Sequence, residues 1–144
     1  MLAAALVSSL VISLSSVAGV PVSCVDDAAW GDAFPAQLGG AHGIYDGVNR
    51  RIYLRQIECD RLQLLVGGTR STNVNRQYEF ASALFLFAHE IAHARGIDDE
   101  ALADCAAGRT FLAVASRLAI GRGYARVLTD YLVNAHIPDR CYPA

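Results

Sequence analysis

The chain has 144 residues, with 12 basic and 14 acidic side chains and a formal net charge of -2 at pH 7. Because the two signs are interspersed, no basic surface for nucleic acid is predicted, and nucleic-acid binding is disfavoured. A chain of this length is expected to form one compact domain. Its sequence contains no internal repeats and no low-complexity segments.

The chain begins with an apolar segment, residues 1–20, that contains no charged side chain. About 20 apolar residues can span a bilayer, so this segment is expected to be a signal peptide or a membrane anchor. Ser16-Val17-Ala18 has small residues at the spacing that signal peptidase uses, which favours removal near Ala18, although the usual positive start is missing. We expect one secreted or extracytoplasmic domain over residues 21–144, in contact with a membrane only if the first segment is retained.

Four cysteines follow this segment: Cys24, Cys59, Cys105 and Cys141. An even number of cysteines in a small exported domain predicts two disulfides. We favour the pairs Cys24 with Cys59 and Cys105 with Cys141, which tie each half of the chain to itself. Each bridge would typically contribute about 2–4 kcal/mol by restricting the unfolded chain.

The next elements are a hairpin and a helix. Residues 44–54 contain Asp46-Gly47 between apolar segments, a pattern that indicates a β-hairpin. Residues 56–66 are expected to form a helix, and the glycine-rich residues 67–73 to form a loop before the next helix.

That next helix carries His89-Glu90-Ile91-Ala92-His93. Positions 89 and 93 are one turn apart, so both imidazoles project from one face and can bind one metal ion, with Glu90 beside them. The preceding residues 78–88 are so apolar that the helix is expected to be buried, where ionisable groups need a partner or a metal. Hydrolytic zinc sites hold three protein ligands and one water, whose pKa falls to about 7. One further ligand is therefore required.

A helical hairpin is expected after this motif. Gly96 favours a left-handed helix stop, and Asp98 is expected to cap a second long helix that continues to about Leu118. A third helix is expected from about Tyr124 to Ala135, after a break at residues 121–123.

The hairpin supplies the missing ligand. Residues equally distant from an antiparallel turn face each other, so Glu100 falls near the level of His93 and Asp104 near that of His89. We therefore predict Glu100 as the third ligand. Asp104 is predicted to accept the other ring N–H of His89, because ligand histidines usually donate that proton to an acceptor that orients the ring.

His-Glu-x-x-His followed by Glu-x-x-x-Asp resembles the signature of the gluzincins, the thermolysin-like zinc peptidases, and residues 100–108 also look like bacterial neutral zinc metallopeptidases. The resemblance covers about residues 80–110. It implies a small α+β zincin-like domain, mostly helical, with a strand edge over the active-site helix that pairs with the substrate. Residues 51–54 are our candidate for that strand. In such enzymes a separate histidine stabilises the oxyanion, and His136 is a better candidate for it than His42.

A second resemblance offers an alternative residue for the third metal ligand. Residues 89–99 fit His-Glu-x-x-His-x-x-Gly-x-x-Asp, a metzincin-like pattern in which Asp99 would bind the metal. Metzincins carry a methionine turn below the metal, whereas the only methionine here is Met1. Glu100 is therefore favoured, with Asp99 as the alternative.

The predicted function is that of an exported zinc metallopeptidase acting on a peptide or protein substrate. His89, His93 and Glu100 would hold Zn2+, and Glu90 would deprotonate the attacking water and pass the proton to the leaving amine. The alternative is a non-catalytic zinc-binding or disulfide-stabilised interaction module on a zincin-like scaffold.

Overall fold

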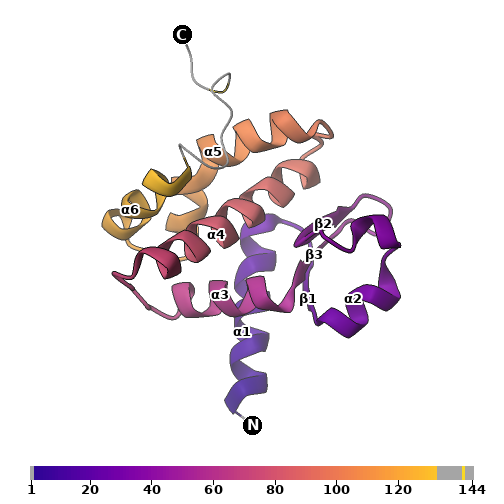
Figure 1. Ribbon diagram of the computed structural model, residues 1–144, viewed down its shortest axis with the longest axis horizontal. Helices are drawn as coiled ribbons and strands as arrows, with labels where there is room; N and C mark the ends of the chain where they lie inside the picture. Colours follow the sequence, from indigo (N-terminus) through magenta and orange to yellow (C-terminus); the bar gives the residue numbers. More distant parts are fainter. Residues whose placement is uncertain (1, 133–140, 142–144) are drawn as a thin grey trace.

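The computed structural model describes residues 2–132 and Cys141. These residues form an α+β fold that is mostly helical, as predicted, with one small sheet (Figure 1). The elements in chain order are α1 (Leu2–Ala18), β1 (Val22–Val25), α2 (Asp27–Ala33), the short 3-10 helix η1 (Ala36–Leu38), β2 (Gly43–Asp46), β3 (Arg51–Arg55), α3 (Gln56–Val66), α4 (Val74–Ala94), α5 (Glu100–Arg117) and α6 (Arg122–Leu132).

Helix α4 forms the centre of the core. It begins at the cap Asn73, whose side chain accepts the backbone N–H of Arg76. It packs against α3, α5, α6 and the sheet, and in the view of Figure 1 it runs between α3 and α5. Large apolar side chains such as Phe80, Leu84 and Phe87 are fully buried along it. Burying that surface is the main stabilising contribution to a domain of this size.

The sheet has the strand order β1-β3-β2. Strands β2 and β3 form the predicted antiparallel hairpin, in which Ile44 lies opposite Tyr53. Strand β1, which was not predicted, pairs with β3 in parallel and places Ser23 opposite Tyr53. The proposal that residues 51–54 form the edge strand is therefore wrong: they belong to β3, the central strand, and the free edge next to α4 belongs to β2.

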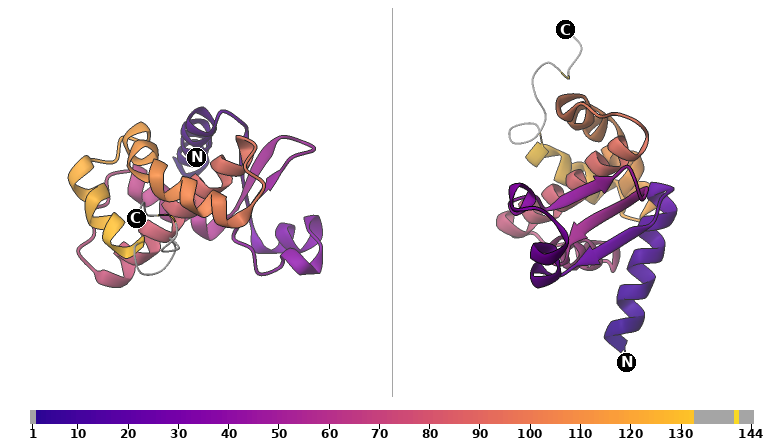
Figure 2. Two further views of the ribbon diagram at one scale, coloured as in Figure 1. Left: turned by 90° about the horizontal axis from the view of Figure 1, so that it is seen from above. Right: turned by 90° about the vertical axis from the view of Figure 1, so that its right-hand side faces the viewer.

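The second half of α1 is packed into the domain. Leu10, Leu14 and Val17 are buried in the common core, and α1 lies against β1 and α3. The guanidinium group of Arg117 donates to the backbone carbonyls of Val17 at 3.1 Å and Ser16 at 3.3 Å. The first half of α1 extends beyond α3 (Figures 1 and 2). Among the described residues, no helix has both the length and the apolar character needed to cross a membrane.

Two disulfides connect the chain with the predicted pairing. Cys24 in β1 is bonded to Cys59 in α3, and Cys105 in α5 is bonded to Cys141. Disulfides persist in oxidising compartments, so this pair of bonds agrees with an extracytoplasmic location.

The predicted helix bounds are close to those of the structure. Helix α3 covers residues 56–66 as expected. Helix α5 begins one step later than predicted, because Asp99 and not Asp98 is its cap, accepting the backbone N–H of Leu102 at 2.8 Å. Helix α6 begins at Arg122, earlier than expected, and the predicted end at residue 135 lies outside the described residues.

Candidate metal centre

The α4–α5 hairpin brings the motif residues together. Gly96 has a φ of +98°, the left-handed conformation expected of it, and it reverses the chain just after α4. The backbone N–H of Gly96 donates to the carbonyl of His93 at 3.0 Å, and that of Ile97 donates to Ala92 at 3.1 Å. This short turn starts α5 directly beside the end of α4, which places Glu100 over the histidines.

Three side chains with potential metal-ligand atoms, called the donor group below, converge at this point: His89, His93 and Glu100. The Nε2 atoms of His89 and His93 lie 3.0 Å apart. Glu100 Oε2 lies 3.0 Å from His89 Nε2, and Glu100 Oε1 lies 3.2 Å from His93 Nε2. Among the described residues this is the one group of three or more such donors close enough to share a metal ion.

The Nδ1 atoms of both histidines make hydrogen bonds that fix the ring tautomers. His93 Nδ1 lies 2.6 Å from the carbonyl oxygen of Ile97, and a carbonyl can only accept, so Nδ1 carries the proton. His89 Nδ1 lies 2.7 Å from Asp104 Oδ1 and donates to that carboxylate. With both rings neutral, each Nε2 presents a lone pair to the other and to the carboxylate of Glu100. A cation is the electrostatic complement of such an arrangement.

The spacing of these donors fits zinc. Zinc binds histidine nitrogen at about 2.0–2.1 Å with tetrahedral angles, which requires neighbouring ligand atoms to lie about 3.3 Å apart. The observed contacts of 3.0 to 3.2 Å are close to that separation. The described residues add no fourth histidine, cysteine or carboxylate to the group, and the side chain of Glu100 is 78% exposed. The group is therefore open on the side that faces the cavity.

The alternative ligand lies outside this group. Asp99 uses its carboxylate to cap α5 and does not line the cavity that contains the histidines. Because α5 starts at Glu100, the side chain of Glu100, and not that of Asp99, lies with the two histidines. The residue that caps a helix points its side chain back at the first-turn N–H groups, and the next residue projects from the helix.

Glu90 lies behind the three donors and is almost completely buried, with 4% of its surface exposed. The backbone N–H of Tyr45 in β2 hydrogen-bonds to its carboxylate, while Oε2 has no hydrogen-bond partner among the described residues. Burial raises the pKa of Glu90 above its ordinary value, His89 and His93 oppose that rise, and the charge of Glu100 adds to it. A buried, unpaired carboxylate oxygen is costly and indicates a functional role.

The side chains of His89, Glu90, His93, Glu100 and Asp104 line one cavity with a volume of about 830 Å³. One wall is a single face of α4, which carries the histidines at its C-terminal end and Phe85 and Ser82 towards its N-terminal end. The opposite wall comes from β2 and the residues before it. The two walls approach closely at Gly43, where an added Cβ would lie 3.1 Å from a methyl group of Leu86. The cavity is therefore an elongated groove with the donor group at one end.

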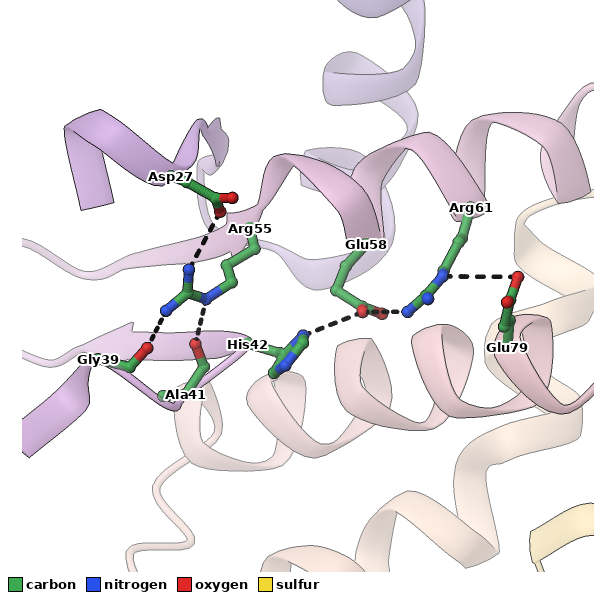
Figure 3. A network of polar contacts seen from close by, with 8 residues as sticks. All are labelled: Asp27, Gly39, Ala41, His42, Arg55, Glu58, Arg61 and Glu79. Atoms are coloured by element: carbon green, nitrogen blue, oxygen red, sulfur yellow. Dashed lines mark hydrogen bonds and ion pairs between the residues drawn. The ribbon is translucent and has the colours of Figure 1, made fainter. Parts of the chain in front are cut away.

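A second polar cluster, shown in Figure 3, also contributes to the lining of this cavity and was not predicted. His42 Nδ1 lies 3.2 Å from Glu58 Oε1, and the guanidinium of Arg61 donates to the same oxygen at 2.6 Å. Arg61 also lies 3.9 Å from Glu79. The spacing of Glu58 and Arg61 on α3 is a helical pair that sequence reasoning could have found, but no sequence signal links them to His42. His136, the other candidate for oxyanion stabilisation, lies outside the described residues.

Comparison with protein-family models, with curated proteins and with solved structures gives no match for this chain. The resemblance to gluzincins therefore depends on the motif residues alone, and the function has to be argued from the geometry of the site.

Proposed function

We propose that the protein is an exported zinc metallopeptidase. The observation that carries this proposal is the meeting, in one groove, of three metal-ligand donors and a buried glutamate. In each histidine Nδ1 donates to an oxygen acceptor, which leaves Nε2 for the metal. One side of the group formed by the three ligand side chains is open. A site built only to join two helices would instead close the fourth position with another protein ligand.

His89, His93 and Glu100 would hold the ion, and Asp104 and the Ile97 carbonyl would keep both rings in the tautomer that binds it. Zinc held there would supply Lewis acidity, lowering the pKa of a bound water and polarising a substrate carbonyl. Glu90 would accept a proton from the attacking water and deliver it to the leaving amine. Its raised pKa, caused first by burial, favours holding that proton between the two steps.

The edge of β2 offers a place for an extended peptide. The backbone N–H of Arg55 donates to His42, and antiparallel pairing alternates, so Gly43 and Tyr45 turn their N–H and C=O groups away from β3. Tyr45 already uses its N–H on Glu90, which leaves its carbonyl and the groups of Gly43 towards the groove. An added strand would therefore run beside the reacting centre.

The first experiment is a measurement of zinc in the full chain, purified without a polyhistidine tag. About one zinc per chain is expected, strongly reduced in Glu100→Ala and retained in Asp99→Ala. Hydrolysis of a peptide mixture by the zinc-loaded protein is then compared with that of Glu90→Gln. A protein that binds zinc but shows no hydrolysis above Glu90→Gln would be a non-catalytic module. A folded protein without zinc would contradict the whole proposal.

A further inference from the structure

The unassigned feature of the groove is His42, which lies away from the donor group and is held in place from two sides. The guanidinium of Arg55 donates to the carbonyl of Ala41 at 2.6 Å and to that of Gly39 (Figure 3). The backbone N–H of Arg55 also donates to the His42 carbonyl at 2.9 Å. The side chain is held by Glu58. Both the backbone and the ring of His42 are therefore held in place.

The ring of His42 is oriented by the contact of its Nδ1 with Glu58. Its Nδ1 faces the carboxylate of Glu58, whose side chain is only 5% exposed, whereas the side chain of His42 is 55% exposed. The carboxylate accepts the Nδ1 proton, so the tautomer protonated at Nδ1 alone presents the lone pair of Nε2 away from Glu58. Arg61 pairs with the same oxygen of Glu58, so the carboxylate mainly orients the ring, and Nε2 keeps its capacity to accept a hydrogen bond.

The backbone spacing favours a place for His42 along the substrate rather than at the reacting bond. Tyr45 contacts Glu90, and His42 precedes Tyr45 by three residues along an extended segment, which corresponds to about 10 Å. An oxyanion donor must approach to about 2.7–3.1 Å. An extended substrate beside β2 also advances by about 3.3 Å per residue, so His42 would meet it about three residues from the reacting bond.

The charge of the groove identifies the side chain that would be accepted there. Its lining residues carry five carboxylates, namely Glu58, Glu90, Asp98, Glu100 and Asp104, and a single guanidinium, that of Arg61. A divalent cation at the donor group would leave this lining negative. A substrate with positive charge is therefore favoured electrostatically over a neutral or acidic one.

We propose that His42, backed by Glu58, is a specificity-determining residue that accepts a hydrogen bond from a lysine or arginine side chain of the substrate, about three residues from the bond that is cleaved. The substrates would then be basic peptides. This inference rests on the proposed peptidase function and names the substrate class of that same site.

The test uses the zinc-loaded full chain and a mixture of peptides randomised at every position. Mass spectrometry identifies the cleaved bonds and the residues around them. In the wild type we expect lysine and arginine to be enriched about tenfold over leucine at one position near the third residue, a preference typical of one hydrogen bond to a charged group. In His42→Ala the enrichment should disappear, and His42→Gln, which keeps a hydrogen-bonding side chain, should retain part of it.

Arg109→Ala is the matched control, because Arg109 is exposed on α5 and does not line the groove. It should keep the wild-type preference. Unchanged zinc content and melting temperature would show that His42→Ala remains folded. Zinc-dependent cleavage without enrichment, or enrichment that survives in His42→Ala, would overturn this inference and leave the peptidase proposal standing. No cleavage above that of Glu90→Gln would overturn both.

Discussion

The groove contains two histidine–carboxylate pairs that differ in what surrounds them. At one end, the side chain of His89 is 12% exposed, its Nδ1 donates to Asp104, and its Nε2 meets two further donors. Away from that end, the side chain of His42 is 55% exposed, its Nδ1 faces Glu58, and no described metal-ligand group includes it. The two pairs share one arrangement, a histidine Nδ1 held by a carboxylate, but only His89 has its Nε2 beside further potential metal ligands. The proposals above therefore give the two pairs different roles, a metal ligand for His89 and a substrate contact for His42.

The largest expected effect is on hydrolysis, and it comes from Glu90, which belongs to neither histidine–carboxylate pair. Glu90→Gln should lower peptide hydrolysis by about 10²–10⁴-fold, because it removes the group that transfers the proton. Zinc content should not change, since Glu90 is not one of the three converging donors. Initial rates and metal analysis on the same preparation check this. Wild-type rates in the variant would show that the reaction does not use Glu90.

Metal removal should affect one pair and not the other. Zinc at 100 to 1,000 times its dissociation constant stabilises a native protein by about 3–4 kcal/mol, so a chelator should lower the melting temperature clearly. Calorimetry measures the shift with and without the chelator. His42→Ala should show the same shift as the wild type and Glu100→Ala little or none. An equal shift in Glu100→Ala would place the ion elsewhere.

The two carboxylates can be compared directly. Asp104→Ala should weaken zinc binding by about 10–100-fold, because the loss of an acceptor frees the His89 ring and its tautomer. Glu58→Gln keeps a hydrogen-bond acceptor for His42 and should leave zinc affinity unchanged. Competition with a fluorescent zinc indicator gives both affinities. If both variants lost zinc equally, the two pairs would not be independent.

The smallest expected effect is a pH dependence of the metal-free protein. The pKa of Glu90 is raised from its ordinary value of 4.5 mainly by burial, so the native state binds more protons than the unfolded state above that pH. Stability from this group is therefore complete below about pH 4 and is lost as the pH rises towards the native pKa. Glu90→Gln should remove this loss and melt higher than the wild type at pH 7. Identical melting curves of the two proteins from pH 4 to pH 7 would contradict it.

Local patterns predicted much of the fold. The bounds of α3, the β2–β3 hairpin and the left-handed Gly96 each depend on residues close in sequence. The parallel pairing of β1 with β3 was missed, because it joins residues about 30 positions apart through a register that no local signal specifies. That omission explains the wrong choice of edge strand, since β3 becomes central only when β1 is added.

The candidate site divides in the same way. The grouping of His89, His93 and Glu100 follows from helical spacing and a short hairpin, so the sequence alone predicts it. His42 and Glu58 are 16 positions apart and meet only because the sheet places the start of β2 beside α3. Their pairing needed the three-dimensional structure.

The contact between Arg117 and the end of α1 has a consequence for the order of biosynthesis. The two segments are 100 positions apart, so the carbonyls of Ser16 and Val17 cannot be engaged until most of the chain has been made. A protease that recognises the small residues at the end of α1 meets an accessible backbone only during that interval. Once α5 has docked, the same bonds belong to a packed and hydrogen-bonded helix end. If α1 is a signal peptide, its removal near Ala18 would therefore have to come before α5 docks.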